Sequence, residues 1–164
     1  MPKTYELSFT SRLDASAPRV WECVATISGV NRELAPWLAM TAPAEALATR
    51  IDDAPVGAPL FASWILLGGR LPIDRHFFEL AHVERGRGFV EASSSWSQAA
   101  WEHRRYVDPC GEGACTLTDR LTFRPRVAAS GPILRRVVRA VFRHRHRVLR
   151  RRFGGTPIDA AAPP

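Results

Sequence analysis

The chain has 164 residues, of which 46% are hydrophobic and 24% charged, so its composition excludes intrinsic disorder and suits one globular domain with one core. Its hydrophobic stretches are shorter than the roughly 18 residues of a membrane-spanning helix, and its first residues form no apolar signal, so we expect a cytoplasmic protein. The net charge of +7 is uneven, because nine arginines and no acidic residue lie between Arg135 and Arg152. Subtracting these nine charges leaves −2 for the remainder.

The N-terminal residues predict one strand and then two short helices. Residues 3–13 alternate between apolar and polar side chains, which is typical of a half-buried strand. Ser16 is a favourable N-cap for the first helix, and Gly29 is expected to end it. Asn31 is expected to cap a second short helix over residues 32–38.

Between residues 42 and 124 the pattern is that of strands joined by short turns. Strands are expected over residues 46–51, 60–67, 71–83, 89–96, 100–107 and 114–123. Because the connections are short, antiparallel neighbours are the simplest arrangement. With the first strand, this predicts an antiparallel sheet of about seven strands.

The last predicted element is a long amphipathic helix. Ser130 is a favourable N-cap, and Gly154 is expected to stop the helix. Between them, apolar residues recur at helical spacing and arginines occupy most of the other positions. Residues 154–164 are rich in Ala and Pro and are expected to form a disordered tail, which leaves residues 1–153 as a single domain.

Four stretches carry a resemblance to a known superfamily. They are the strand-to-helix junction Leu13–Trp21, the motif Trp101-Glu102-His103, the strand Leu117–Phe123, and Phe142–His146 followed by Leu149. In this element order they resemble the helix-grip fold of the START-like, or SRPBCC, superfamily, which includes birch-pollen-allergen-like proteins and polyketide cyclases. The resemblance spans about residues 3–153 and implies an α+β fold. In that fold the C-terminal helix covers the concave face of a curved sheet, leaving an apolar cavity for a small hydrophobic or amphipathic ligand.

Four charged or polar residues on the predicted strands share the parity of the apolar face: Glu91, His103, Arg105 and Asp119. A pairing of Val107 with Cys115 would set the register of the last two strands. In that register His103 lies directly opposite Asp119, and Trp101 opposite Leu121. A four-residue turn after Trp96 would place Glu91 opposite Arg105. We therefore predict that the four side chains form a polar cluster inside an otherwise apolar cavity.

His103 and Asp119 have three interpretations. They are a pair that only stabilises the fold, for example through Arg145, or they bind a ligand by hydrogen bonds. Alternatively, Asp119 fixes the tautomer of His103, which acts as the general base of a polyketide cyclase or dehydratase. Buried polar groups are usually simply hydrogen-bonded, so the structural interpretation is favoured. We expect a protein that binds a ligand and either has no catalytic activity or has one of unknown kind. A polyketide cyclase or dehydratase is the alternative.

Further residues are expected to contact the ligand: Trp64, Phe78, Trp101, Val141, His144 and Arg145. Trp96 is a further candidate for an aromatic cavity wall, and ordinary core packing is the alternative for these aromatic residues. Asp74 and His76 either face the cavity with Phe78 or face solvent, and an edge or rim position is favoured because Pro72 is close to them.

Neither a metal ion nor a cofactor is predicted. The sequence has no histidine or cysteine motif with metal-ligand spacing, no P-loop and no G-x-G-x-x-G. The odd number of cysteines indicates reduced thiols. A redox pair or half a metal site at Cys110 and Cys115, which flank a turn, is the weaker alternative, because no second Cys or His pair at ligand spacing accompanies them.

The arginine-rich helix 135–152 also has three interpretations. Its arginines form a solvated face whose stems cover the apolar stripe, or they dock on an anionic membrane surface, or they bind nucleic acid. The sequence lacks a recognition helix and an RNA-binding aromatic motif, which disfavours nucleic acid. The solvated face is favoured, the membrane surface is second, and the oligomeric state is left open.

Overall fold

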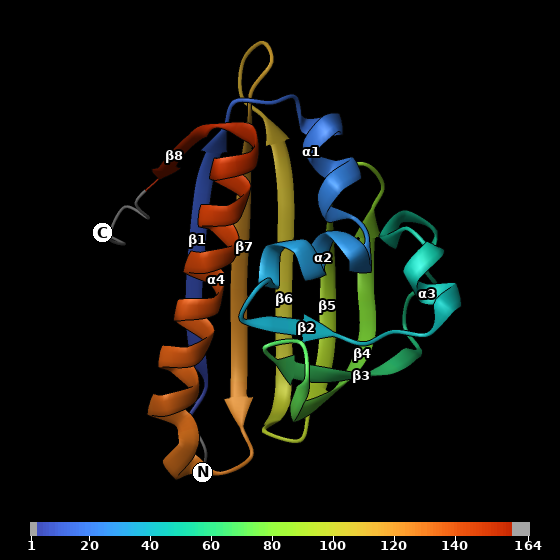
Figure 1. The fold of residues 1–164 in the computed structure, drawn as a ribbon, viewed down its shortest axis with the longest axis vertical. Helices are drawn as coiled ribbons and strands as arrows, with labels where there is room; N and C mark the ends of the chain where they lie inside the picture. The colour runs from blue at the N-terminus through green and yellow to red at the C-terminus, as the bar shows by residue number, and fades with distance from the viewer. Residues whose placement is uncertain (1–2, 159–164) are drawn as a thin grey trace.

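A computed structural model describes residues 3–158 and shows a curved antiparallel sheet with one long helix across its concave face (Figure 1). The helices are α1 (Ala17–Val24), α2 (Ile27–Leu34), α3 (Ala44–Ala48) and α4 (Gly131–Phe153). Two short 3₁₀ turns, η1 (Ile51–Asp53) and η2 (Ala128–Ser130), precede β3 and α4. The strands are β1 (Tyr5–Leu13), β2 (Leu38–Met40), β3 (Pro59–Leu67), β4 (Leu71–Glu84), β5 (Gly88–Ser95), β6 (Gln98–Pro109), β7 (Cys115–Pro125) and β8 (Gly155–Ile158).

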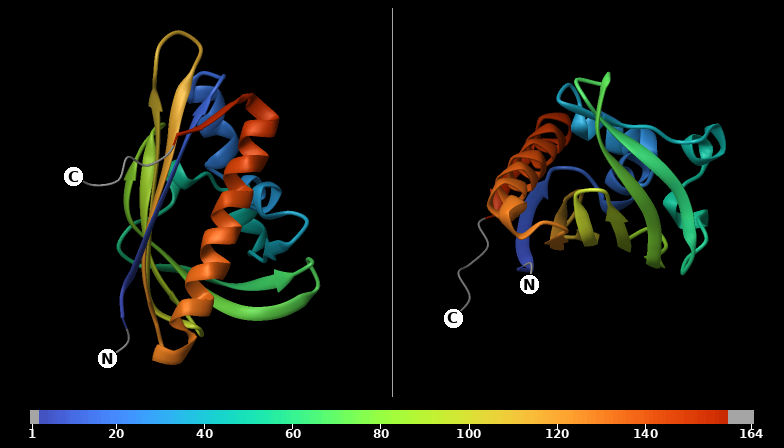
Figure 2. Two further views of the ribbon diagram at one scale, coloured as in Figure 1. Left: turned by 90° about the vertical axis from the view of Figure 1, so that its left-hand side faces the viewer. Right: turned by 90° about the horizontal axis from the view of Figure 1, so that it is seen from below.

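The eight strands have the order β2-β3-β4-β5-β6-β7-β1-β8, and every neighbouring pair is antiparallel. Seen from below, the sheet bends so that α4 lies over β1 and β7, while β3 and β4 rise on the opposite side (Figure 2). The strands predicted from residue 60 onward and the long helix are confirmed. No helix within residues 3–158 is long and apolar enough to cross a bilayer.

The strand predicted over residues 46–51 is wrong. Helix α3 and the turn η1 occupy this stretch, because the sequence Ala-Glu-Ala-Leu-Ala consists of strong helix formers. The sheet instead gains β2, where Leu38 pairs with Leu67 of β3. This exchange places a helix over the outer part of the concave face.

The predicted limits of the two short helices are also wrong. Helix α1 ends at Val24, and α2 begins at Ile27, where the Thr26 hydroxyl accepts a hydrogen bond from the Gly29 backbone N–H at 3.0 Å. Gly29 lies in the first turn of α2 and does not end α1. A Cβ atom at Gly29 would lie 1.9 Å from the Cys23 carbonyl oxygen, so the close approach of the two helices requires glycine.

The segment after α4 is not a disordered tail throughout. Gly154 ends the helix as predicted, but residues 155–158 form β8 and pair with β1, with Gly155 opposite Leu13. A Cβ atom at Gly155 would lie 2.0 Å from the Arg12 carbonyl oxygen, so glycine lets the two backbones approach. Periodicity gave no signal for so short a strand. Residues 159–164 of the predicted tail lie outside the described residues.

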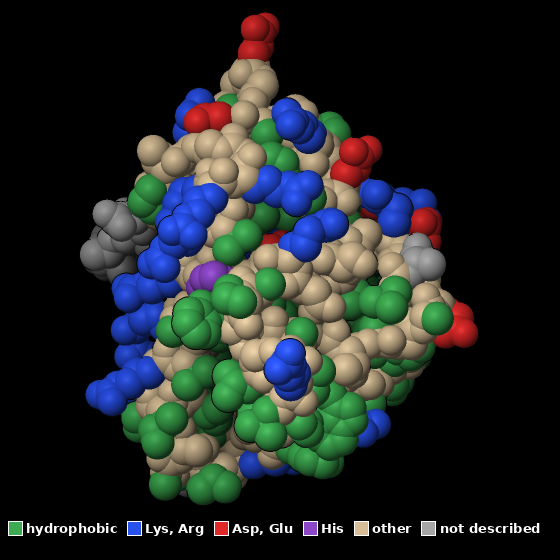
Figure 3. Space-filling model, in the orientation of Figure 1, with side chains coloured by type: hydrophobic (Ala, Val, Ile, Leu, Met, Phe, Trp, Pro, Cys, Tyr) green, Lys and Arg blue, Asp and Glu red, His purple; other side chains and the backbone are tan. Residues whose placement is uncertain are grey.

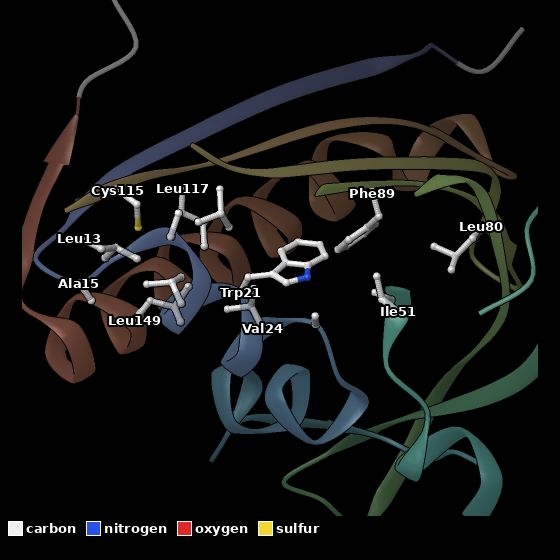
Figure 4. Packing of buried hydrophobic residues seen from close by; sticks show 14 of the residues in the cluster. Leu13, Ala15, Trp21, Val24, Ile51, Leu80, Phe89, Cys115, Leu117 and Leu149 are labelled. Atoms are coloured by element: carbon white, nitrogen blue, oxygen red, sulfur yellow. The ribbon is translucent and has the colours of Figure 1, made fainter. Parts of the chain in front are cut away.

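The hydrophobic core has two parts. The larger part surrounds Trp21 of α1 and continues through Leu117 and Phe89 to Ile51 and Leu80 at its far end (Figure 4). The smaller part joins Phe142 of α4 to residues of β7 and neighbouring strands. His103 contacts both parts, since its ring centroid lies 5.2 Å from that of Phe89 and 5.1 Å from that of Phe142.

Candidate functional site

The register of β6 and β7 differs from the predicted one by two residues. Pro109, and not Val107, pairs with Cys115, because the turn after β6 is shorter than expected. Asp119 therefore lies opposite Arg105. A shift of two residues leaves every side chain on its predicted face, so the polar cluster still forms.

The neighbouring strand pairs have also moved. Glu91 of β5 lies opposite His103 and not opposite Arg105, and Trp101 lies opposite Phe123 and not opposite Leu121. Both changes again amount to two residues. His103 consequently has the Glu91 carboxylate on one side and reaches Asp119 along the diagonal on the other.

Arg105 is the centre of the polar cluster and is fully buried. Its Nε and Nη2 atoms donate to the two Asp119 carboxylate oxygens, each at 2.7 Å. Its Nη1 atom donates to both oxygens of Glu33 on α2, at 2.8 and 3.0 Å. Arg145 of α4 donates to Glu33 from its Nε atom at 2.8 Å. The guanidinium groups thus tie α2 and α4 to the middle of the sheet.

Three buried histidines extend the cluster. His103 Nε2 lies 2.8 Å from Asp119 Oδ1, and its Nδ1 lies 3.6 Å from Glu91 Oε2. His76 Nε2 lies 2.5 Å from the other Glu91 oxygen. His146 of α4 lies 3.0 Å from Asp119 Oδ2 through its Nε2 atom. The result is a continuous chain of charged and polar groups from β4 to α4.

The charges in this cluster stabilise one another. Burial opposes ionisation of Glu33 and Asp119, but the adjacent guanidinium of Arg105 outweighs it and holds the pKa of both carboxyls below the usual range. Burial also opposes ionisation of Glu91, yet His76 and His103 lower its pKa. For His76 burial favours the neutral ring, but the Glu91 carboxylate raises its pKa. The surroundings of the cluster therefore favour the ionised form of its three carboxylates.

Several members of the cluster were missed or misplaced from the sequence. Glu33 and His146 were not predicted, although His146 shares the buried stripe of α4 with Phe142 and Leu149. That spacing was the available signal. His76 is not at a rim but 7% exposed, because β4 is an inner strand between β3 and β5. Asp74, by contrast, bonds to Ser95 and Ser97 near the β5–β6 turn.

The other predicted ligand contacts do not gather in one place. Trp64 stacks edge-on against Trp96, and Trp96 is 59% exposed. This pair therefore does not form the wall of a closed cavity. Trp101 packs on Phe123 and Phe142 in the smaller core. The remaining two are on α4, where Val141 packs beside the smaller core and His144 Nε2 contacts the Ala35 carbonyl oxygen at 2.7 Å.

Ser11, His146 and Asp119 form a sequence of contacts like that of a nucleophilic triad. Ser11 Oγ lies 2.8 Å from His146 Nδ1, and the other ring nitrogen contacts Asp119. However, Ser11 is 1% exposed, and its oxygen also accepts a hydrogen bond from Arg150 Nη1 at 2.8 Å. A nucleophile must reach its substrate, so this arrangement is structural. Within residues 3–158, no three His, Cys, Asp or Glu side chains are placed to hold a metal ion.

The three cysteines are not joined to one another. Cys115 is buried at the start of β7, while Cys23 and Cys110 are partly exposed. Burial raises the pKa of the Cys115 thiol to about 11. Such a thiol is a poor nucleophile at neutral pH.

A pocket of about 240 Å³ opens at the other end of the concave face, between α3 and β3–β4. Its apolar walls include Ile51, Ala54, Leu60, Phe61, Phe78 and Leu80. Polar side chains also line it, namely Thr26, Glu45, Thr49 and Arg50. None of the polar cluster's residues lines this pocket. Phe78 is the one predicted ligand contact that does, and it stacks on Phe61 with ring centroids 5.4 Å apart.

One carboxylate holds the wall of this pocket in place. The Asp52 oxygens in η1 accept hydrogen bonds from Trp21 Nε1 at 2.9 and 3.1 Å and from the Gly86 backbone N–H at 3.0 Å. Burial opposes ionisation of Asp52, but the hydrogen bonds from Gly86 and Trp21 outweigh it and lower the pKa. Asp52 thereby anchors η1 to α1 and to the β4–β5 turn.

Comparison with known families places most of the chain in one of them. Residues 11–153 match the family described as "Domain of unknown function (DUF8410)". The chain belongs to this family. No curated protein matches the sequence. The polar cluster and the pocket both lie within the part of the chain that this DUF8410 domain covers.

Solved structures identify the fold of the DUF8410 domain. A START superfamily protein from Mycobacterium smegmatis matches with a TM-score of 0.63 at 12% identity, covering 90% of this chain and 96% of that one. The Zhui aromatase/cyclase from Streptomyces sp. R1128 matches with a TM-score of 0.65 at 12% identity, covering 90% and 92%. Protein CV1439 from Chromobacterium violaceum gives 0.63 at 14% identity, covering 93% and 99%. The predicted START-like helix-grip fold is confirmed, and at these identities the likeness shows the fold alone.

Proposed function

We propose that this DUF8410 domain binds a small hydrophobic ligand in the pocket between α3 and β3–β4, without chemical change to it. The observation that carries the proposal is the pocket itself, with two stacked phenylalanines in its wall and polar side chains among its lining. Ligand sites are commonly concave, mostly apolar and equipped with a few polar groups. The START-like fold supports the same class of function.

The pocket's size limits the ligand. Its volume of about 240 Å³ exceeds the ~150 Å³ that suffices for benzene and falls below the ~300–1,000 Å³ typical of drug-sized ligands. A single aromatic ring with short substituents, or a short branched alkyl group, fits this space. A fused polyketide of several rings exceeds it.

The burial of the polar cluster argues against catalysis by its residues. A cyclase that used His103 and Asp119 would need substrate against the His103 ring, whose side chain is 4% exposed and lies between Phe89 and Phe142. Both oxygens of Asp119 already accept hydrogen bonds from Arg105. No observation favours the enzymatic alternative over a structural role.

The test is a ligand titration in which binding is monitored by NMR. We expect p-cresol and indole to shift the backbone amide signals of residues around the pocket, such as Ile51 and Leu80. The substitution Ala54→Phe fills the pocket and is expected to weaken binding at least tenfold. Ala92→Phe is the matched control, because Ala92 is exposed on β5 away from the pocket. Equal binding by wild type and Ala54→Phe, or no binding of either probe, would refute the proposal.

A further inference from the structure

Hydrophobic side chains gather on one face of the molecule, over the β3–β4 hairpin and the first half of α4 (Figure 3). We call this the apolar patch and define it by its exposed members: Trp37, Leu67, Leu71, Ile73, Ile133 and Val137. Their exposed fractions lie between 47% and 64%. Single exposed apolar residues are ordinary, but a contiguous group marks an interaction site.

Two separate parts of the chain build the apolar patch. Leu67 pairs with Leu71 across the hairpin, and the Gly68 N–H donates to the Trp37 carbonyl oxygen at 2.7 Å, which brings Trp37 to the hairpin tip. Ile133 and Val137 are one turn apart on α4 and point away from its buried stripe. Nothing within the described residues covers these side chains.

Unpaired arginines border the apolar patch along α4. Seven of the helix's nine arginines make no salt bridge and no side-chain hydrogen bond within the described part of the chain: Arg135, Arg136, Arg139, Arg143, Arg147, Arg151 and Arg152. Arg136, Arg143 and Arg147 are exposed and recur at intervals of seven and four residues, so they form a row beside Ile133 and Val137. Figure 3 shows the arginines as a continuous band next to the apolar patch, with the carboxylates of this face lying elsewhere.

We propose that this face, the apolar patch together with the arginine row, docks on the surface of an anionic lipid bilayer. Side chains such as Trp37 and Leu71 enter the interfacial region, where tryptophan is favoured, and the arginines contact lipid phosphates. Charge complementarity selects this occupant. A symmetric second copy of the chain would bring two such patches, and their bordering arginine rows, together. Nucleic acid would satisfy the arginines and leave the apolar patch without a partner.

The test is co-sedimentation of the full chain with vesicles at physiological salt. Vesicles of phosphatidylcholine with about 30% phosphatidylglycerol are expected to bind the protein, and pure phosphatidylcholine vesicles to bind far less. Replacing the row (Arg136→Gln, Arg143→Gln and Arg147→Gln) is expected to weaken binding about 100-fold, from about a factor of five for each arginine. The matched control removes three charges elsewhere (Arg19→Gln, Arg120→Gln and Arg124→Gln) and is expected to lose much less.

A second variant separates insertion from simple charge attraction. Leu71→Ser with Ile73→Ser keeps every charge and is expected to reduce binding at least fivefold. Equal binding by this variant and the wild type would overturn the proposal, as would no binding to anionic vesicles. If the chain binds duplex DNA and these two substitutions leave that binding unchanged, the face belongs to nucleic acid instead. If the chain forms a dimer in sedimentation velocity and the substitutions abolish it, the face belongs to a second copy.

Discussion

The two sides of the concave face differ in what fills them. Under α4 the space holds aromatic rings and a chain of buried ion pairs, in which two arginines, three carboxylates and three histidines contact one another. Under α3 the space is an open pocket with an apolar wall and no buried ion pair in its lining. One sheet therefore carries a closed, polar half that stabilises the fold and an open, apolar half that has room for a ligand.

The largest expected effect comes from breaking the closed half. Arg105→Leu leaves Glu33 and Asp119 buried without their main partner, so we expect a loss of about 3–5 kcal/mol in the free energy of unfolding. Urea unfolding followed by circular dichroism measures it. Arg104→Leu is the matched control on the outer face of the same strand, and it should change stability little. Similar losses for both variants would contradict the central place given to Arg105.

A smaller effect is expected at the open half. Asp52→Ala removes the acceptor that holds η1 to Trp21 and Gly86, and we expect a loss of about 1–2 kcal/mol in the free energy of unfolding. Because η1 contributes Ile51 to the pocket wall, affinity for p-cresol should fall as well. Asp53→Ala is the control, since Asp53 is exposed and pairs only with Arg85. Unchanged ligand affinity in Asp52→Ala would show that the pocket does not depend on the hydrogen bonds of Asp52.

The smallest effect is the pH dependence of the closed half. The raised pKa of His76 means that its contribution to stability is present below the ordinary value of 6.5 and is lost as pH rises through the folded-state pKa. The lowered pKa values of Glu33, Asp119 and Glu91 give stability above their ordinary values of 3.8 to 4.5, lost as pH falls. Thermal melts should therefore show maximal stability between about pH 4.5 and 6.5.

A substitution at His76 tests this profile. His76→Gln should flatten the alkaline side and also weaken the acid side, because Glu91 loses a partner that lowers its pKa. His82→Gln, at an exposed histidine on the same strand, should leave both sides unchanged. An unchanged alkaline slope in His76→Gln would show that another group causes it.

The strands from β3 to β7 and helix α4 were predictable because their apolar residues repeat with one clear period over many positions. The register of the strands was not predictable. It depends on the length of the turn at Cys110 to Ala114, and the composition of that stretch does not reveal how long the turn is. The faces survived this error, since the register moved by two residues. The four predicted cluster residues were therefore found together despite the wrong pairing.

The other members of the cluster depend on tertiary contacts. Glu33 is on a short helix whose limits were misjudged, and only the packing of α2 on the sheet buries it against Arg105. The pocket was missed for a related reason, because residues 46–51 were assigned to a strand. A helix there leaves a hollow where a paired strand would not.

The two margins of the sheet show how this fold avoids unwanted strand pairing. The outermost strands, β2 and β8, have three and four residues, whereas β1, directly inside β8, has nine. Short margins offer few free backbone groups to a neighbouring molecule, and Pro157 in β8 has no N–H to donate. Strand β8 pairs with Thr10–Leu13 of β1, so without β8 the free edge of β1 would lengthen from Tyr5–Phe9 to the whole strand, and a longer free edge is a place where aggregates can start.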